Sequence, residues 1–379
     1  MERTKPKITK KTVILPIVGI LAFLLYVYFF NVDLFSIIST AQAAKPIPYI
    51  AAILISFIEI LFYALSWNEL LAGLKVKLSL FKAYTFVWYG MFLDILVPAE
   101  SISGEICRVY LCNREQSGTG GRVVASLVTF RLLSMVMNTV FLLLGAVLLF
   151  GVAQIDPLVF DIIQFLVIGS AVLFVVFLIV SRKEAWSTRI IGGAIRVGEF
   201  IGRGKWKLEK IRNDAFNAAK AFHSSMKDVM ENPRKLVVPI IYLTLNWASS
   251  MTIPYLVFIS LGYDVSWGVV FVTTSIVVAI KSIPVGIPFE VGLPEIAMTT
   301  VYTAVGVPPG IAATSTILSR IITLWLRFIV GFAAYQWTEL KAVTSNATQN
   351  VNGASVSQLP RMNTLNAETC REYSGQLLT

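Results

Sequence analysis

The sequence predicts an all-α polytopic membrane protein, and three features point to this fold class: the composition, a series of apolar segments and a duplicated charged motif. Hydrophobic residues make up 56% of the 379 residues, charged residues make up only 14%, and the mean hydropathy is +0.73. A soluble chain of this length would need more charge to cover its surface. The net charge of +10 therefore indicates basic loops that face anionic lipid headgroups, and it does not indicate a nucleic-acid partner.

Six apolar segments are long enough to cross a bilayer. They cover residues 13–30, 46–74, 123–151, 158–180, 236–261 and 311–337. Lys and Arg gather in residues 1–12 and in the loop 182–235, which predicts that both lie on the cytoplasmic side of the plasma membrane. Residues 341–379 are polar and without hydrophobic periodicity, which is typical of a disordered tail. We therefore expect a transmembrane domain at 13–340, with both termini in the cytoplasm.

Two further apolar stretches are interrupted near their middle and predict re-entrant helical hairpins. The first covers residues 81–111 and the second covers residues 265–305. Neither half of either stretch is long enough to span alone, although eight full spans remain an alternative. A broken helix at membrane depth is tolerated where protein or water covers it. The residues expected to break the helices are Pro98, Gly104, Pro284, Gly286, Pro288, Gly292 and Pro294.

The distribution of basic residues gives the two hairpins opposite orientations. The first is flanked by Lys82 at one end and by Arg108 and Arg114 at the other, whereas the flanks of the second are poor in Lys and Arg. The first hairpin should therefore open to the cytoplasm and the second to the outside. The span–hairpin–span units at 46–151 and 236–337 then form an inverted repeat, an arrangement typical of transporters.

Each hairpin carries the pattern P-x-E-x-x-x-x-E, and an arginine in an apolar helix follows each copy at similar spacing. Arg131 follows Glu105, and Arg320 follows Glu295. Arg327 lies seven residues after Arg320, so both should fall on about the same helix face. The candidate substrate-binding residues are Glu59, Glu100, Glu105, Arg108, Arg131, Glu290, Glu295, Arg320 and Arg327.

Two interpretations of these charges remain open, and they are not exclusive. The pairs Glu105–Arg131 and Glu295–Arg320 would be buried ion pairs that hold the hairpins in the bundle, because neither charge is tolerable alone. Alternatively, the same groups would line a polar cavity in which an arginine binds a lipid phosphate as a bidentate fork. Glutamates at positions 59, 100 and 290 would then take protons or contact a cationic part of the headgroup.

The sequence does not predict an enzyme, a metal site or a cofactor. It contains one histidine, His223, and its three cysteines lack metal-ligand spacing. We find no Ser–His–Asp set, no Walker A loop and no dinucleotide-binding glycine motif. The glycines at 118–121 lie between helices and predict a turn.

Several short motifs, taken in order, resemble a known family. They are Leu96-Val97-Pro98, Gly104-Glu105, Arg108, Phe130-Arg131, Ile283-Pro284-Val285-Gly286-Ile287-Pro288, Gly292, Pro294-Glu295, Gly306-Val307 and Ser319-Arg320. Over about residues 10–340 the chain resembles the flippase-like membrane region of lysylphosphatidylglycerol synthases, which also occurs as stand-alone bacterial and archaeal membrane proteins. The resemblance implies movement of an amphiphilic lipid, or of a polyprenyl-linked sugar, between leaflets.

Two departures from the family bear on this expectation. The bifunctional synthases carry a soluble aminoacyltransferase domain after the membrane region, whereas here only residues 341–379 follow, so synthase activity is not expected. The family's first motif usually reads P-x-x-x-G-E, and here Glu100 and two serines fill it. The headgroup preference therefore stays open.

Three functional hypotheses follow. The first is a lipid flippase or transporter of the cytoplasmic membrane. The second is a non-transporting accessory protein that anchors a cytoplasmic lipid- or glycan-modifying enzyme through the loop 182–235. The third, a membrane enzyme acting on lipid headgroups, is disfavoured by the missing nucleophile–base set. The expected partners are membrane lipids and not nucleic acid, and a homo-oligomer or a cytoplasmic enzyme partner stays open.

Overall fold

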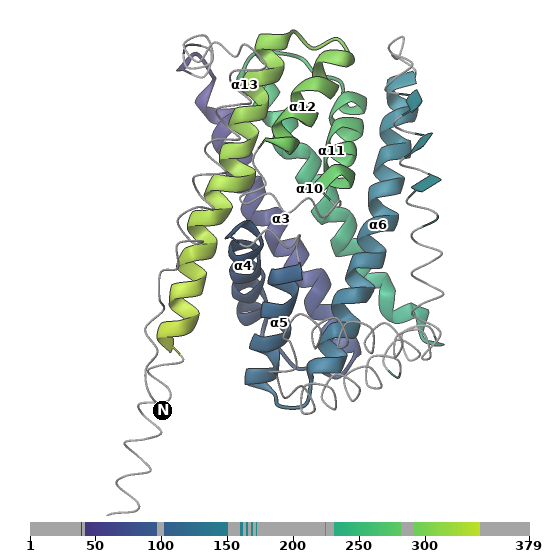
Figure 1. The fold of residues 1–379 in the computed structure, drawn as a ribbon, viewed down its shortest axis with the longest axis vertical. Coiled ribbons are helices and arrows are strands. Elements are labelled where there is room, and N and C mark those ends of the chain that lie inside the picture. The colour runs from purple at the N-terminus through teal and green to yellow at the C-terminus, as the bar shows by residue number, and fades with distance from the viewer. Residues whose placement is uncertain are drawn as a thin grey trace, which may run out of the picture. The chain divides into compact units, whose positions relative to one another are not determined.

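The structure is a computed structural model, and it describes residues 42–96, 102–150, 231–281 and 292–341 together with isolated positions at 39, within 160–172 and at 224. Every regular element in these ranges is helical (Figure 1). Contacts divide the chain into two units, Met1–Ala334 and Tyr335–Thr379. The site described below lies within the first.

Four of the six predicted spans are present as helices that are long and apolar enough to cross a membrane. They are Pro46–Gly73, Gly120–Leu148, Pro233–Ser260 and Pro309–Lys341. The predicted span 13–30, all of the predicted span 158–180 except the isolated positions within 160–172, most of the loop 182–235 and the tail after 341 lie outside the described residues. The prediction of a polytopic all-α protein is therefore confirmed for the described part of the chain.

Helix α3 (Pro46–Gly73) shows how the sequence builds a span. Its first helical turn contains proline, which suits this position because the N–H that proline lacks would be unpaired there. A stripe of large apolar side chains at helical spacing stays exposed on this helix: Ile47, Ile50, Leu54 and Ile58. Such a stripe on a soluble protein would be a liability, whereas lipid tails can cover it.

The inner faces of three helices form a small apolar core. Ala52 of α3 packs with Ile253 and Val257 of α10 (Val237–Ser260), and with Leu318 of α13 (Pro309–Arg320). The side chain of Tyr49 adds a hydrogen bond from its hydroxyl to the carbonyl of Leu318, at 3.3 Å. Helices α3, α10 and α13, which are far apart in the sequence, are therefore in direct contact. This packing fixes the positions from which their polar side chains project.

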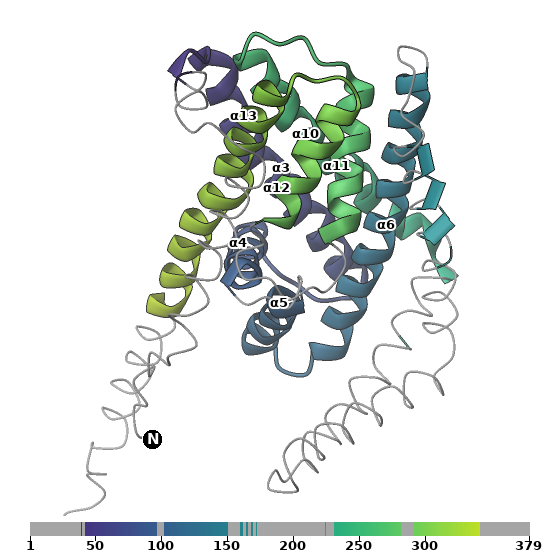
Figure 2. The ribbon, with the colours of Figure 1, turned by 45° about the horizontal axis from the view of Figure 1, so that its top comes forward.

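The predicted hairpins are pairs of short helices. Helices α4 (Leu80–Leu96) and α5 (Ile102–Glu115) form the first pair. Helices α11 (Trp267–Lys281) and α12 (Leu293–Ala304) form the second. None reaches the roughly 20 residues that a span requires. Figures 1 and 2 both show α4 and α5 near one end of the bundle and α11 and α12 near the other.

The residues expected to break the helices are only partly described. Pro98, Pro284, Gly286 and Pro288 lie outside the described residues. Gly292 is the N-cap residue of α12 with a φ of 101°, and a proline follows within the first two positions of the helix. A left-handed φ favours glycine. The proline is Pro294, which lies in the first turn of α12, where the N–H that proline lacks would have no partner within the helix.

Gly104 corrects the prediction for the first break, because it lies within the first turn of α5 and does not interrupt the helix. Its role is close packing. A Cβ atom built on it would lie within 3 Å of the Asp94 carboxyl group on α4 and of the carbonyl oxygen of Gly90. Only glycine allows the two short helices to approach this closely.

The last described span contains a further irregularity. Residues Ile321–Leu326, immediately after α13, form a π-helix, and helical structure then continues to Lys341. A π-helical turn shifts the register of the following residues by about one position, or roughly 100° around the axis. The expectation that Arg320 and Arg327 share a helix face assumed a regular α-helix. In the structure Arg320 pairs with Glu295 and Arg327 pairs with Glu59, as described below.

Candidate functional site

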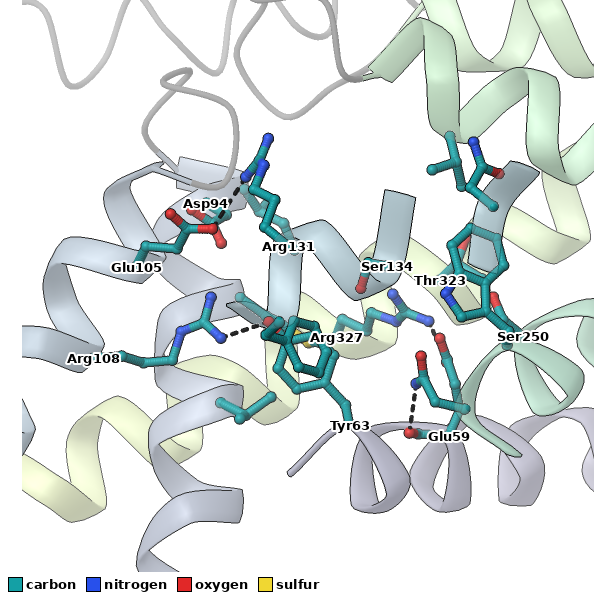
Figure 3. Close-up of a pocket in the computed structure, with 18 of the residues that line it drawn as sticks. Glu59, Tyr63, Asp94, Glu105, Arg108, Arg131, Ser134, Ser250, Thr323 and Arg327 are labelled. Atoms are coloured by element: carbon teal, nitrogen blue, oxygen red, sulfur yellow. Dashed lines mark hydrogen bonds and ion pairs between the residues drawn. The ribbon is translucent and has the colours of Figure 1, made fainter. Parts of the chain in front are cut away.

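A cavity of about 350 Å³ lies inside the helical bundle. Its volume falls in the usual range for small-molecule sites. Its walls come from α3, α4, α5, α6 (Gly120–Phe150), α10, α11 and the last described span. Six charged side chains, drawn among the sticks of Figure 3, line it: Glu59, Asp94, Glu105, Arg108, Arg131 and Arg327. Such groups are costly among apolar helices, so each one needs a partner or a function.

Glu59 and Arg327 form the first ion pair of the cavity, between α3 and the segment after the π-helix. The Nη2 atom of Arg327 lies 2.5 Å from Oε2 of Glu59, and Glu59 is only 6% exposed. The Nδ2 atom of Asn246 donates a 2.8 Å hydrogen bond to the backbone carbonyl of Glu59. Among the residues that the structure describes, the buried Nε atom of Arg327 has no hydrogen-bond partner, so the pair does not satisfy every donor of the guanidinium group.

Glu105 and Arg131 form the second ion pair, between α5 and α6. The Nη1 atom of Arg131 lies 3.1 Å from Oε1 of Glu105, and about a third of each side chain is exposed, 33% and 29%. The predicted ion pair is therefore present, and it is the most open of the charged pairs at this site. Glu105 lies in the first turn of α5, where the helix dipole favours a carboxylate.

Arg108 occupies the same wall but has a different environment, since it is 4% exposed. Its Nη1 atom donates a 2.5 Å hydrogen bond to the hydroxyl of Tyr63, and its Nε atom donates to the carbonyl of Gly104 at 3.2 Å. The guanidinium carbon lies 5.4 Å from the ring centroid of Tyr63 and 5.6 Å from that of Trp67. Both distances are within the range of cation–π attraction.

Two roles for Arg108 were predicted from the sequence, a basic residue at the cytoplasmic end of the first hairpin and a candidate binding residue. The structure places it in the wall of the cavity, whereas Arg114, one turn and a half further along α5, is exposed. Burial next to aromatic rings on α3 explains the difference, since arginine can bury its stem and stack its planar group on a ring.

Asp94 ties the two short helices of the first hairpin together. Its Oδ1 atom accepts a 2.8 Å hydrogen bond from the hydroxyl of Ser103 and a 2.6 Å hydrogen bond from the backbone N–H of Gly104. The first N–H groups of a helix have no partner within the helix. The side chain of Asp94 on α4 therefore caps the N-terminus of α5.

Glu295 and Arg320 do not belong to the cavity. Oε1 of Glu295 lies 2.5 Å from Nε of Arg320, and the two side chains are only 4% and 8% exposed. The other carboxylate oxygen, Oε2, accepts a 2.7 Å hydrogen bond from the backbone N–H of Gly292. The predicted ion pair is confirmed, and it also caps α12. The two copies of the motif thus give one open pair and one enclosed pair.

The candidate residues from the sequence therefore separate into three groups. Glu59, Glu105, Arg108, Arg131 and Arg327 meet at one cavity. Glu295 and Arg320 form a separate enclosed pair. Glu100 and Glu290 lie outside the described residues.

Several polar residues of the cavity were not singled out from the sequence. Besides Asp94 and Tyr63 they are Ser134, Asn138, Asn246, Ser250 and Thr323. Their spacing is a signal that was available. Arg131, Ser134 and Asn138 repeat at helical spacing on α6, as do Asn246 and Ser250 on α10. Polar side chains that share one face of an apolar helix indicate a polar interior.

The charged lining is suited to binding a polar ligand. Among the described residues, no group of three or more His, Cys, Asp or Glu side chains is placed to hold a metal ion. The cavity instead combines guanidinium groups, carboxylates, hydroxyls and amides. Guanidinium groups bind phosphate and carboxylate oxygens through paired hydrogen bonds, so the arrangement can hold a polar headgroup within an apolar bundle.

Comparison with known proteins gives a family and several relatives. A family described as the lysylphosphatidylglycerol synthase TM region matches residues 13–331. UPF0104 membrane protein PH1989 of Pyrococcus horikoshii is 25% identical over 74% of this chain and 84% of its own length. A UPF0104 membrane protein of Methanothermobacter thermautotrophicus is 24% identical, over 77% and 86% respectively. UPF0104 membrane protein MJ1595 of Methanocaldococcus jannaschii is 23% identical, over 87% and 95%. No solved structure matches the chain.

Proposed function

The chain belongs to the family of the lysylphosphatidylglycerol synthase transmembrane region, and from this premise we propose that it moves a lipid between the leaflets of the plasma membrane. The lipid would be a phospholipid or a polyprenyl-linked molecule. The observation that carries the proposal is the charged cavity inside a bundle of apolar helices. The relatives are named only as membrane proteins, so they add the family and no activity.

Movement of a lipid between leaflets requires a polar headgroup to pass through hydrocarbon, which is energetically costly. The cavity would lower this cost by providing polar groups inside the bundle. Hydroxyl, amide and charged groups would replace the water that the headgroup loses. The open pair Glu105–Arg131 is a suitable first contact, because its arginine can exchange the carboxylate for a lipid phosphate while the freed carboxylate, which is 29% exposed, stays partly solvated. The acyl chains would stay in the surrounding lipid.

The position of the two short-helix pairs supports a transporter mechanism. They lie near opposite ends of the bundle (Figures 1 and 2), as the inverted repeat predicts. Transporters with inverted repeats open a central site to one side and then to the other by moving one part against the rest. In the proposed mechanism the first hairpin closes the cavity on the cytoplasmic side and the second closes it on the outer side.

No covalent step is part of this proposal. The charged groups of the cavity bind, neutralise and release the headgroup, and the lipid leaves unchanged. Transport then depends on differences in binding between states of the protein. Membrane lipids are the partners that this mechanism needs.

The experiment is lipid exchange in vesicles that contain the purified protein. Headgroup-labelled lipids are placed in both leaflets, and a quencher that cannot cross the membrane reports the fraction that reaches the outer leaflet over time. We expect the protein to accelerate exchange of at least one phosphate-containing lipid over that in protein-free vesicles. The double variant Glu105→Gln/Arg131→Gln should slow that exchange about tenfold or more, since charged hydrogen bonds contribute about 1.5–3 kcal/mol.

A matched control is available on the same hairpin. Lys82 of α4 and Glu115 of α5 also form an ion pair, at 2.5 Å, but they lie outside the cavity and are 41% and 33% exposed. The variant Lys82→Gln/Glu115→Gln should exchange lipid at the wild-type rate. The proposal is wrong if wild-type protein accelerates no lipid of the panel, and the site assignment is wrong if the two double variants behave alike.

A further inference from the structure

The three guanidinium groups of the cavity differ in one respect that decides which of them is available to a ligand. Arg131 and Arg327 each lie within ion-pair distance of a carboxylate. In the part of the chain that the structure describes, Arg108 has no carboxylate oxygen within 4 Å. Asp94 and Glu105 are close enough to interact with it electrostatically, but Oδ1 of Asp94 already accepts hydrogen bonds from Ser103 and Gly104, and Oε1 of Glu105 pairs with Arg131.

Arg108 is also the most firmly positioned of the three. The guanidinium carbon of Arg108 lies within cation–π distance of the rings of Tyr63 and Trp67, and these rings are themselves held in place. The ring of Tyr63 lies 4.3 Å from that of Phe130, and Nε1 of Trp67 donates a 3.1 Å hydrogen bond to the hydroxyl of Ser126. A preorganised group loses little freedom on binding a ligand.

The hydrogen bonds of Arg108 leave part of its fork unused. A guanidinium group has five N–H donors. Nε donates to Gly104 and Nη1 donates to Tyr63. The second terminal nitrogen, Nη2, donates to no group among the described residues. A buried cation in this state is costly unless an anion is brought to it.

We infer that Arg108 is the anion-binding residue of the cavity and that the group it binds is a phosphate oxyanion. This inference rests on the proposed function, because it names the chemical group that the same cavity takes. A tetrahedral phosphate can accept hydrogen bonds from the N–H donors of Arg108 that bind neither Gly104 nor Tyr63. The rings of Tyr63 and Trp67 stay within cation–π distance of the guanidinium carbon. The phosphodiester of a lipid and free inorganic phosphate share this chemistry, so the test separates them.

The test measures equilibrium binding to the full chain in detergent micelles, and it does not need transport. Radiolabelled phosphatidylglycerol is the probe, and diacylglycerol of the same chains is the phosphate-free comparison. Arg108→Gln should weaken binding of phosphatidylglycerol about 10- to 100-fold, the loss expected for charged hydrogen bonds. Arg108→Lys should weaken it less, because the charge remains and only the fork is lost. Binding of diacylglycerol should change in neither variant.

Arg114→Gln is the matched control. Arg114 lies on the same helix, is exposed, and sits over the ring of Tyr110 outside the cavity. Binding of phosphatidylglycerol should not change in this variant. If Arg108→Gln and Arg114→Gln bind phosphatidylglycerol equally well, or if diacylglycerol binds wild-type protein as tightly as phosphatidylglycerol does, the inference fails.

Competition by inorganic phosphate and glycerol phosphate identifies the source of the anion. Displacement only by intact lipids assigns a lipid phosphodiester, and displacement by inorganic phosphate at similar concentration assigns a soluble phosphate; either result supports Arg108 as its receptor. Should Arg108→Gln fail to fold, Tyr63→Phe removes only the hydroxyl that positions the guanidinium group. It should weaken binding about 3- to 10-fold, the loss expected for one hydrogen bond, and unchanged binding would overturn the inference.

The inference and the proposed function can fail separately. Binding that depends on Arg108 without any lipid exchange in vesicles would retain the inference and reject transport. Exchange that continues at the wild-type rate in Arg108→Gln would retain transport and reject the assigned role of Arg108.

Discussion

The charged side chains of this protein separate by exposure. Glu295 and Arg320 are almost enclosed, whereas Glu105 and Arg131 are about one-third exposed. A buried ion pair adds little net stability compared with an apolar pair, but removal of one partner leaves a buried charge uncompensated. A partly solvated pair suffers less from the same change, because water screens the remaining charge. The enclosed pair should therefore be important for stability and the open pair for ligand exchange.

The first prediction concerns Glu295→Gln. Glutamine keeps an acceptor for the N–H of Gly292 but removes the charge that compensates Arg320, so the variant should lose about 3–5 kcal/mol of unfolding free energy. Glu105→Gln should lose clearly less. Chemical unfolding of both variants in mixed micelles gives the comparison, and equal losses would contradict the assigned roles.

At the scale of helices, the first hairpin depends on close contact between α4 and α5. Gly104 faces Gly90 and Asp94 without room for a side chain, and Asp94 caps the first turn of α5. The contact also positions Arg108, whose Nε atom donates to the carbonyl of Gly104. One glycine therefore links helix packing to the geometry of the cavity.

The second prediction is that Gly104→Ala separates these helices. The added methyl group meets the Asp94 carboxyl group and the backbone of Gly90, and overpacking of this kind typically costs about 1–3 kcal/mol. We expect that loss in micelle unfolding, together with slower lipid exchange. Gly120→Ala is the control, because a Cβ atom there meets nothing within 4 Å. Its effect should stay within about 0.5 kcal/mol, and a similar loss in both variants would contradict the packing argument.

Sequence patterns predicted the helices better than the contacts between them. Apolar length and proline positions located the four described spans and both short-helix pairs. The role of Gly104 could not be read in this way, because it depends on a neighbour that only tertiary packing supplies. The π-helix at Ile321–Leu326 lies in an ordinary apolar run without glycine or proline, so local sequence carried no signal for it.

At the scale of the whole molecule, the inverted repeat predicts opposite orientations of the two hairpins in the membrane. The loop after α5 and the start of α13 lie near opposite ends of the bundle (Figure 1). If the inverted repeat is correct, these positions face the cytoplasm and the outside respectively. Both positions are exposed: Ser117 lies in the loop after α5, and Gly310 lies in the first turn of α13.

The third prediction uses single cysteines at these two positions. In a chain with Cys370→Ser, whose other cysteines, Cys107 and Cys112, are buried, a maleimide that cannot cross the membrane should label Gly310→Cys in intact cells. It should label Ser117→Cys only after the cells are permeabilised. Labelling of both positions from the same side would exclude the inverted arrangement.

The candidate site was predicted only in part, because its composition depends on tertiary contacts between helices that are distant in the sequence. The pairs Glu105–Arg131 and Glu295–Arg320 were expected because the repeated motif placed them at matching spacing. The partner of Glu59 was not, since Arg327 lies 268 positions away and the π-helix changes the direction in which it points. Which charges share one cavity depends on which helices become neighbours, and spacing along the chain does not give that information.

The distance between Glu59 and Arg327 along the chain also has a consequence for biosynthesis. Helix α3 emerges from the ribosome long before the span that contains Arg327. Throughout that interval the acid on α3 lacks the guanidinium group that compensates it in the finished bundle. A nascent chain that stops before α13 would therefore leave this acid uncompensated among lipids, which makes the last span a requirement for assembly of the bundle.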